Sequence, residues 1–369
     1  MKALFITHDI SAYGASKSLQ LLLNNLDGIE VDLIVSKRLF GRHDVARIKQ
    51  KFGPAVRHVY QYYLPFDKHV VASFEKSPLV YIYDAIKSIL WRWDRPRLYA
   101  LARRNGYSFV HLNSLVLNPL IDPGLPFIIH IRELLDGERK EIKARINNAR
   151  GVVFIDEEVK KPFAGLSLRQ SVVLNNPVDM RRLAEARGQI QRSALAEDNK
   201  GKTVFSVIGL ISEEKGVGFI IEAFRQMNDP QARLLIVGAG PLRYVNECKK
   251  AAAGDSRIIF HGEEDDMLNI YYLSDYVLRG EDRPRIGRTI YEGLYSDCGV
   301  IIPKGSGAIE MDDHDKFRDS IFFYPVRNAP ALAQLLQKLT AKKRAKDKFC
   351  GNVEAYVKGF KEFVLKAIG

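Results

Sequence analysis

The sequence predicts an α/β protein made of two successive parallel-sheet domains. Short apolar runs alternate with amphipathic stretches along most of the chain, which is the pattern of βαβ units. The alternation restarts once, near the middle, so two series of similar size follow one another. A length of 369 residues is also more than one compact core usually covers. Two Rossmann-like domains are therefore expected.

The expected strands are short, apolar and bounded by polar residues. In the first series they are the runs KALFITH (2–8), VDLIVS (31–36), FVHLNS (109–114), PFIIHIRE (126–133) and GVVFIDE (151–157). In the second series they are TVFSVIGL (203–210), ARLLIVGAG (232–240), RIIFHGE (257–263), YVLRG (276–280) and CGVIIP (298–303). We expect one domain over 1–180, a second over 181–345, and a C-terminal helix within 346–369 that packs back toward the first domain. The polar, alanine-rich stretch 184–202 has the composition of a linker or a surface helix.

The composition narrows the class of protein. Hydrophobic residues at 46% and charged residues at 27% are ordinary for a soluble globular enzyme. The three cysteines are odd in number and show no CxxC spacing, which favours a reducing compartment over a disulfide or zinc framework. No run approaches transmembrane length, and the N-terminal apolar run is too short for a signal peptide. These features predict a cytoplasmic protein.

The formal net charge of +12 indicates either an anionic partner or a basic surface without a specific role. Nucleic acid, an anionic membrane and phosphorylated substrates are the usual anionic partners. Because the sequence shows no stacking platform and no nucleic-acid-binding motif, we expect no nucleic acid.

One region, residues 60–104, interrupts the strand–helix alternation. It holds both tryptophans of the chain, within the run Trp91, Arg92 and Trp93, together with many tyrosines and basic residues. Aromatic rings and cations together are typical of a helix that lies in a membrane interface. The alternative is a pair of helices packed on the sheet with a basic outer face. These three residues are the expected contact with a membrane or an acceptor.

The strand run that ends at Gly209 is followed by a lysine–glycine pair. A glycine at a strand end lets a ligand approach the backbone, and a lysine on the next loop can meet a phosphate as a point charge. Lys215, followed by Gly216 at an expected helix start, fits that description. A loop lysine is otherwise most often a solvated charge. Gly238 and Gly240 repeat the theme as a weak signal, because such glycines are common for steric reasons.

The stretch GEDRPRIGRTIYEGL (280–294) is the strongest local indication of a ligand site. Gly287 ends a loop, and helical spacing follows it. Amide groups and the dipole at a helix N-terminus favour phosphate, and Arg288 can add bidentate hydrogen bonds. Glu292, one turn later, can accept two hydrogen bonds from the hydroxyls of a ribose. The alternative for the arginines is a surface paired with Glu281 and Asp282.

A resemblance emerges from several blocks in order. They are VIGLISEEKGVGFIIEAF, ARLLIVGAGPL, IIFHGE, IYYLSDYVL, IGRTIYEGLYSDCGVII and GSGAIE in the second half, with GASKSLQLLL and NNPVDM in the first. Together they resemble the retaining GT-B-fold glycosyltransferases of the glutamate-x7-glutamate group (family 4 type, glycosyl transferases group 1). The resemblance spans nearly the whole chain. It implies the GT-B fold, in which the first domain binds the acceptor and the second binds the nucleotide sugar across a cleft.

The resemblance also implies roles for individual residues. Lys215 matches the lysine that binds the donor diphosphate, Glu292 the glutamate that holds the ribose, and His130 the histidine that faces the donor sugar. The implied catalytic residues are His130, Lys215 and Arg288. The implied donor-binding residues are Gly14, Ala15, Gly209, Lys215, Gly287, Arg288, Thr289, Glu292, Gly307 and Glu310.

Two positions depart from the family pattern. The first motif glutamate falls on Pro284, and the arginine after the strand glycine falls on Leu210. The substitutes that we expect are Glu281 or Asp282 for the glutamate, and Arg283, Arg285 or Arg288 for the arginine. The competing explanation is that catalysis has been lost.

The predicted activity is therefore a hexosyl transfer from a nucleotide sugar to an acceptor hydroxyl, with retention. The resemblance and the basic aromatic region favour a glycan or lipid-linked acceptor in surface-polysaccharide or lipid-linked glycan assembly, at the cytoplasmic face of a membrane. No metal and no cofactor are expected, because enzymes of this fold neutralise the leaving diphosphate with cationic side chains and helix dipoles. The alternatives are a catalytically degenerate glycan- or partner-binding module and a GT-B-fold sugar-nucleotide epimerase.

Overall fold

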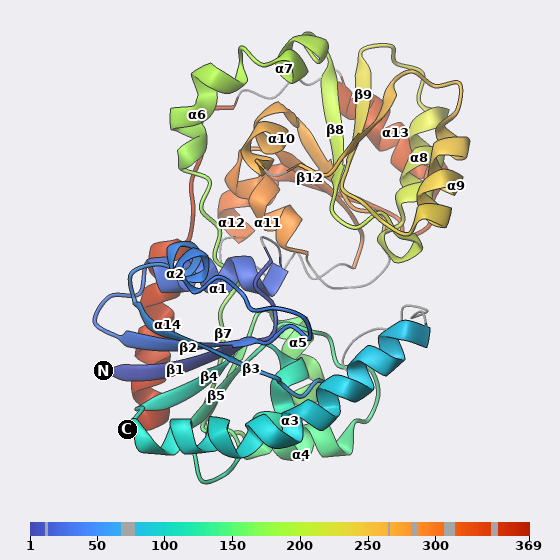
Figure 1. The fold of residues 1–369 in the computed structure, drawn as a ribbon. Helices are drawn as coiled ribbons and strands as arrows, with labels where there is room; N and C mark the ends of the chain where they lie inside the picture. The colour runs from blue at the N-terminus through green and yellow to red at the C-terminus, as the bar shows by residue number, and fades with distance from the viewer. Residues whose placement is uncertain (12–13, 68–77, 265, 282–286, 306–313, 341–345) are drawn as a thin grey trace. The chain divides into compact units, whose positions relative to one another are not determined.

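The computed structural model describes residues 1–11, 14–67, 78–264, 266–281, 287–305, 314–340 and 346–369. The chain divides into two compact units (Figure 1). The N-terminal unit comprises Met1–Pro177 together with Asn352–Gly369, and the second unit comprises Val178–Gly351. The structure thus divides the chain after 177 and 351, where the sequence placed boundaries after 180 and 345.

The N-terminal unit alternates strands and helices. Its strands are β1 (Lys2–Thr7), β2 (Glu30–Ser36), β3 (Val56–Tyr62), β4 (Phe109–Leu112), β5 (Phe127–Ile131), β6 (Gly151–Phe154) and β7 (Ser171–Val173). Its helices are α1 (Gly14–Asn24), α2 (Val45–Phe52), α3 (Pro78–Arg104), α4 (Lys140–Asn147), α5 (Glu157–Lys160) and α14 (Val353–Ile368), with 3-10 turns η1 (Leu115–Leu120) and η2 (Lys161–Phe163).

The strands of this unit form a parallel sheet that is covered on both faces. In the described residues the sheet has seven strands in the order β3-β2-β1-β4-β5-β6-β7. α1, α2 and α14 pack on one face, and α3 and α4 lie on the other (Figure 1). Because successive side chains of a strand point to opposite faces, Leu4 and Ile6 enter one core while Ala3 and Phe5 enter the other. This accounts for the continuous apolar run of β1, which is typical of a parallel strand.

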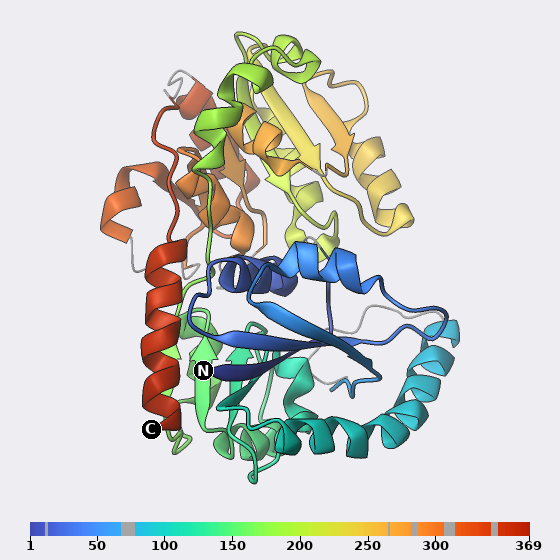
Figure 2. The same ribbon diagram turned by 60° about the vertical axis from the view of Figure 1, so that its left-hand side comes forward.

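α14 carries the chain back into the N-terminal unit at its end. Figure 2 shows it running alongside the sheet of that unit. Its buried face includes Phe360 and Phe363, and Gly151 at the start of β6 leaves room for the Phe363 ring, because a Cβ there would lie 2.8 Å from its Cζ atom. The last helix is therefore part of the N-terminal core.

The second unit has its own alternation of elements. Its strands are β8 (Thr203–Ile208), β9 (Ala232–Val237), β10 (Ile258–Gly262), β11 (Tyr276–Leu278), β12 (Gly299–Pro303) and β13 (Ile321–Tyr324). Its helices are α6 (Arg182–Ile190), α7 (Ala194–Asp198), α8 (Val217–Gln226), α9 (Leu242–Ala252), α10 (Met267–Leu273), α11 (Arg288–Tyr295), α12 (His314–Phe317) and α13 (Ala329–Thr340), with 3-10 turns η3 (Glu213–Lys215) and η5 (Arg318–Ser320).

This unit is a second Rossmann-like layer structure. Its sheet, within the described part of the chain, has six parallel strands in the order β10-β9-β8-β11-β12-β13. α8, α9 and α13 pack on one face, and α6, α10 and α11 on the other. β8 pairs with β9 on one side and β11 on the other, so the chain order reverses between β8 and β11. Loops that leave this point on opposite faces of a sheet open a crevice, where ligands of such folds bind.

The sequence missed the strands β3, β7 and β13, all of which lie at sheet edges. An edge strand is covered less completely than a central one, so its residues need not form a continuous apolar run. β3 has only one fully buried residue, Val56, followed by the exposed Arg57 and His58. The stretch 184–202, expected as a linker or surface helix, contains α6 and α7.

Substitution of Phe360 by alanine should lower the free energy of unfolding of the N-terminal unit by about 3–5 kcal/mol, because it opens a cavity in a fully packed core. Leu365→Ala is the control, since Leu365 is 57% exposed on the same helix, and it should cost less than about 0.5 kcal/mol. Denaturant unfolding of the full chain, followed by hydrogen exchange in each unit, measures both. Equal effects of the two substitutions would contradict the packing of α14 into this core.

Candidate functional site

The carboxyl ends of β8 and β11 in the second unit meet through a glycine-to-glycine backbone contact. Gly216 has a left-handed backbone (φ +64°), and a Cβ there would lie 2.3 Å from the carbonyl oxygen of Gly280. A Cβ on Gly280 would likewise lie 2.4 Å from the carbonyl oxygen of Gly216. No other residue type fits either position without moving backbone. The contact places the loop after β8 directly against the loop after β11.

The loop after β9 joins the same edge of the sheet. Gly238 has φ +134°, and a Cβ on it would lie 1.9 Å from the carbonyl oxygen of Gly209. The amide of Ile211 donates to the carbonyl of Ala239. A Cβ on Gly240 would lie 1.9 Å from the carbonyl oxygen of Ile211, so Gly238 and Gly240, the weak signal in the sequence, are required by the close approach of these two loops. Leu210, at the position of the missing family arginine, is 43% exposed.

An ionic cluster forms where these loops touch. Lys215 Nζ lies 3.0 Å from Glu281 Oε2 and 3.2 Å from Glu281 Oε1, and Arg279 Nε pairs with Glu281 Oε1. The side chains of Glu281 and Arg279 are 6% and 7% exposed, whereas that of Lys215 is 36% exposed. Two cations thus share the carboxylate of Glu281, and Lys215 is the member of these three that reaches solvent.

This placement corrects the expectation for Glu281, which was a substitute for the missing motif glutamate as a contact of the donor sugar. Its carboxylate is buried and engaged by two cations. Asp282, Arg283, Pro284 and Arg285 lie outside the described residues, as do Gly307 and Glu310. The cation that sequence reasoning missed is Arg279. Its position directly after the apolar run of β11 is the sequence feature that could have indicated it.

A second charged cluster lies on α11, which begins at Arg288 with Gly287 as its N-cap. Arg288 Nε donates to Glu292 Oε1 at 2.7 Å, and the Tyr271 hydroxyl donates to Glu292 Oε2 at 2.7 Å. Burial raises the pKa of Tyr271, and the negative charge of Glu292 raises it further, so the phenol remains a hydrogen-bond donor. Arg288 and Glu292, which the sequence assigned separately, are therefore partners. Tyr271 had not been identified.

The start of α11 lies against the first cluster. A Cβ on Gly287 would lie 3.3 Å from a terminal nitrogen of Arg279, and Gly287 offers no side chain to cap the first amides of the helix, among them that of Thr289. The start of α8 also reaches this edge, where the Gly218 amide donates to the Tyr244 hydroxyl at 3.1 Å. Amides at helix starts and neighbouring cations together favour an anion.

The carboxyl edge of the N-terminal sheet carries a polar cluster of its own. Arg132, directly after β5, donates to Asn176 Oδ1 at 2.7 Å and to Asn113 Oδ1 at 3.2 Å. Asn113 in turn donates to the carbonyl of Ala15 at 3.1 Å, in the first turn of α1 after Gly14. β1 and β4 are neighbours at the point where the strand order reverses, so this cluster occupies the corresponding position in its own sheet.

The structure contradicts the assignment of His130 as a residue that faces the donor sugar. Its side chain is completely buried, stacked on Tyr356 of α14 at 6.3 Å between ring centroids. Arg132 approaches His130 Nδ1 at 3.3 Å. Burial lowers the pKa of His130 well below its usual value, and the charge of Arg132 lowers it further. A neutral His130 therefore lies inside the core, in contact with Arg132.

His111 lies beside His130 and is held neutral by the same forces. Its ring packs against Phe5 at 4.6 Å and His130 at 5.9 Å. Burial lowers its pKa to about 3, with a smaller contribution from Arg132. Both histidines are therefore core residues.

The two tryptophans have separate environments. Trp91 packs partly buried against the core of the N-terminal unit, whereas Trp93 is 70% exposed and Arg92 is exposed. The expected run of three membrane or acceptor contacts therefore divides between the core side and the outer side of α3. No helix in the described part of the chain combines the length and the apolar character needed to cross a membrane.

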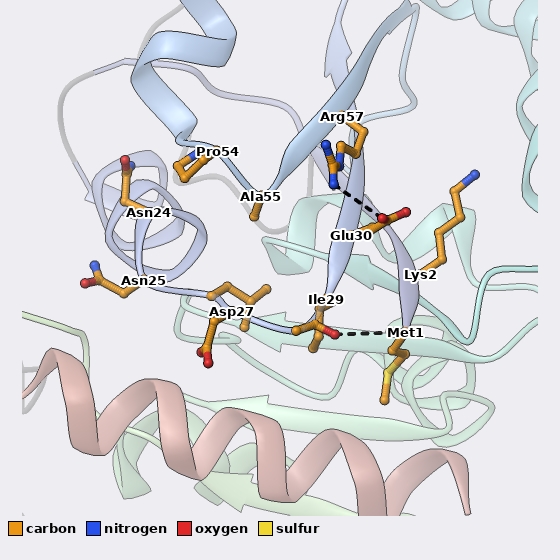
Figure 3. A pocket seen from close by; sticks show the side chains of 12 residues that line it. Met1, Lys2, Asn24, Asn25, Asp27, Ile29, Glu30, Pro54, Ala55 and Arg57 are labelled. Atoms are coloured by element: carbon orange, nitrogen blue, oxygen red, sulfur yellow. Dashed lines mark hydrogen bonds and ion pairs between the residues drawn. The ribbon is translucent and has the colours of Figure 1, made fainter.

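A pocket in the N-terminal unit is separate from these clusters. A pocket of about 800 Å³ lies where β1 and β2 begin, and Figure 3 shows its lining, with Arg57 paired to Glu30. It is at the amino end of the strands, opposite to the edge where such sheets bind ligands. Among the described residues, no three His, Cys, Asp or Glu side chains are grouped so that they could hold a metal ion.

Comparison with known families identifies the second unit. Residues 202–342 match the family model described as "Glycosyl transferases group 1". These residues form a glycosyl transferases group 1 domain. The match contains both clusters of the candidate site, from Lys215 to Glu292. A search of curated proteins found no significant match to the sequence.

Solved structures show the fold of the whole chain. HepE of Anabaena, solved in complex with UDP, superposes with a TM-score of 0.69 at 17% identity, covering 100% of this chain and 97% of that chain. Sucrose-phosphate synthase of Thermosynechococcus elongatus gives a TM-score of 0.68 at 17% identity, covering 99% and 96%. A glycosyltransferase of Rickettsia africae gives 0.66 at 17% identity, covering 100% and 95%. The chain therefore has the GT-B fold of two Rossmann-like domains.

The two fully buried histidines, His111 and His130, predict how the stability of the N-terminal unit depends on pH. A histidine that is neutral in the fold and protonated when unfolded makes the protein less stable as the pH falls below its unfolded pKa of 6.5, and for His111 the loss continues to about pH 3. Each buried histidine contributes up to about 1.4 kcal/mol per pH unit. Denaturant unfolding between these pH values should show this decline in the N-terminal unit.

The matched variant is His111→Phe, which keeps a ring among Phe5 and Phe360 and removes one of the two fully buried histidines. It should flatten the pH dependence of unfolding by up to about 1.4 kcal/mol per pH unit, because His130, His8 and His43, whose pKa values are also lowered, continue to titrate. An unchanged slope would contradict the assignment of His111 as a buried neutral histidine.

Proposed function

We propose that this chain is a retaining glycosyltransferase of the hexosyltransferase type, with a nucleotide sugar as donor. In the proposed reaction the bond between the anomeric carbon and the diphosphate oxygen breaks. The acceptor hydroxyl oxygen bonds to the same carbon and releases its proton to the departing diphosphate. The proposal is supported by the glycosyl transferases group 1 match and by similar structures described as complexes with UDP and with UDP-glucose.

The observation that carries the proposal is the pair of cations, Lys215 and Arg279, that meets at the reversal point of the second sheet, with Lys215 partly exposed. The start of α11 lies against Arg279. Negative charge develops on the diphosphate as the sugar leaves, so cations and amides fixed in advance stabilise the transition state more than the ground state. Lys215 is the proposed contact of the diphosphate because it is the exposed member of the cluster.

Glu292 is the proposed contact of the donor ribose. Arg288 and Tyr271 each donate to one of its oxygens, and a carboxylate oxygen can accept a further hydrogen bond from a hydroxyl. The two donors fix the carboxylate on α11, so little side-chain entropy is lost when a diol binds. The proposed reaction requires no metal and no cofactor, because cationic side chains and helix amides neutralise the leaving group.

The proposed acceptor is a glycan or a lipid-linked sugar, handled by a peripheral protein at the cytoplasmic face of a membrane, in surface-polysaccharide or lipid-linked glycan assembly. The net charge of +12 and the exposed Trp93 and Arg92 support this part of the proposal. The polar cluster around Arg132 is the proposed acceptor side, since it occupies the carboxyl edge of the N-terminal sheet.

A second candidate function, donor binding without turnover, is favoured by one observation. Glu281 engages Lys215 where a transferase needs that lysine for diphosphate, and proline occupies the position of the first motif glutamate. Release of nucleoside diphosphate from a bound donor separates the two functions, because only the transferase releases it when acceptor is present.

A thermal-shift panel of UDP-, GDP-, ADP- and TDP-sugars should reveal one donor that raises the melting temperature of the full chain, because a ligand stabilises the fold that binds it. Lys215→Ala and Glu292→Ala should each weaken that donor at least about tenfold, since each removes a charged hydrogen-bonding partner. Calorimetric titration of the same donor measures the loss.

Lys338→Ala is the control for Lys215→Ala, because Lys338 is an exposed lysine on α13 of the same unit, outside both clusters. It should leave donor affinity unchanged. Wild-type affinity in both Lys215→Ala and Glu292→Ala would show that the donor binds elsewhere.

Glu281→Gln should tighten the binding of UDP about fivefold. The amide keeps the shape of the side chain and removes the negative charge that competes with diphosphate for Lys215. It also weakens the ion pair of the buried Arg279, so thermal melting of the variant checks that it folds. Glu213→Gln makes the same charge change at an exposed position of η3 and should have little effect. Weaker UDP binding in Glu281→Gln would show that the carboxylate acts by positioning Lys215 instead.

A further inference from the structure

The outer side of α3 carries an apolar stripe. Ile86, Ile89 and Trp93 are 41%, 57% and 70% exposed, and their spacing of three and four residues puts them on one face of the helix. Pro96, which is exposed, and Ala100, which is half-buried, continue this face. The opposite side of the helix is closed by Leu98 and Ala102, which are in the core of the N-terminal unit. The stripe is therefore not part of the core-facing side.

Basic residues flank the stripe. From residue 85 to residue 104 the helix has six lysines and arginines, and Asp94 is the sole acidic residue in that range. Asp94 is buried, where it accepts a hydrogen bond from the amide of Tyr63 and pairs with Arg97. Arg92, Arg97 and Arg104 are exposed. Basic side chains thus predominate around the stripe.

A groove of about 340 Å³ opens next to the stripe. It is lined by Arg95, Pro96, Tyr99, Ala100, Arg103 and Asp122. The guanidinium groups of Arg95 and Arg103 lie 5.9 and 5.6 Å from the centre of the Tyr99 ring, and the Tyr99 hydroxyl is fixed by the carbonyl of Leu120 at 2.8 Å. Arg103 also pairs with Asp122 at 2.8 Å and remains 57% exposed. Two guanidinium groups held around a rigid ring form a place for a phosphate.

We infer that this face of α3 docks on a bilayer of anionic phospholipid, with a headgroup phosphate between Arg95 and Arg103 and the stripe inserted at the level of the acyl chains. Rings and aliphatic side chains flanked by arginines are the composition of an interfacial helix. An excess of positive charge, with Asp122 paired to Arg103, complements an anionic lipid surface. The inference names the residues that would hold the protein at the membrane, and it rests on the proposed function because that function places the protein there.

The test uses sedimentation of the full chain with vesicles of phosphatidylcholine alone or mixed with phosphatidylglycerol. Binding to the mixed vesicles and weak binding to the neutral ones is expected, with a steep loss as salt is raised. Ile89→Ser with Trp93→Ser should weaken binding roughly tenfold. Arg95→Gln with Arg103→Gln should weaken it by a similar factor. All four side chains lie at the surface or at the groove, and thermal melting of each variant checks that it folds.

The controls have the same chemistry elsewhere on the chain. Phe40→Ser with Leu365→Ser removes two apolar groups that are 88% and 57% exposed. Arg243→Gln with Arg318→Gln removes two charges from the exposed surface of the second unit. Both pairs should bind vesicles as the unaltered chain does. If the control arginines matter as much as Arg95 and Arg103, the binding comes from net charge and the inference is wrong.

Two further outcomes would also overturn it. One is no binding to anionic vesicles by the folded chain. The other is a change in oligomeric state in the Ile89 and Trp93 variant with unchanged vesicle binding, which would assign the stripe to a second copy of the chain. Failure of the proposed function has a different signature, namely loss of donor binding in the thermal-shift panel with vesicle binding intact.

Discussion

The candidate site in the second unit depends on the backbone contact between Gly216 and Gly280. A side chain at either position would overlap a carbonyl oxygen, so the approach of the two loops requires glycine at both. The contact has an electrostatic consequence, because it brings Lys215 to Glu281 and Arg279. The lack of side chains at Gly216 and Gly280 thus allows Lys215, Glu281 and Arg279 to meet at this edge of the sheet.

Burial of charge shapes both clusters of the second unit. Glu281 and Arg279 are almost wholly removed from water, and an unpaired charge there would cost several kcal/mol of desolvation. The cluster therefore needs at least one cation for Glu281, and it has two. On α11 the carboxylate of Glu292 is similarly satisfied by Arg288 and Tyr271. Neither carboxylate is an isolated charge awaiting a ligand, so ligand binding there is an exchange of partners.

In the N-terminal unit, basic or aromatic residues that are close in the sequence or in space lie in different environments. His111 and His130 are neutral core residues, while the cation Arg132 occupies the sheet edge directly above them. On α3, Trp91 belongs to the core and Trp93, two residues later, belongs to the surface. Helical geometry separates the two rings by about 200° at 3.6 residues per turn, so a cluster in the sequence becomes two environments in the fold.

The sequence by itself determined the fold class, the central strands and the family of the second unit. Apolar periodicity and the order of the glycine-containing blocks are properties of the sequence itself and can be recognised without a structure. It did not determine the edge strands: β3 carries the exposed Arg57 and His58, and β7 and β13 are only 3 and 4 residues long. The partners of charged residues were also decided by the tertiary structure alone. His130 is inside the core, Glu281 is engaged by cations, and Arg279 lies beside Lys215, because burial and pairing depend on which loops the sheet topology brings together.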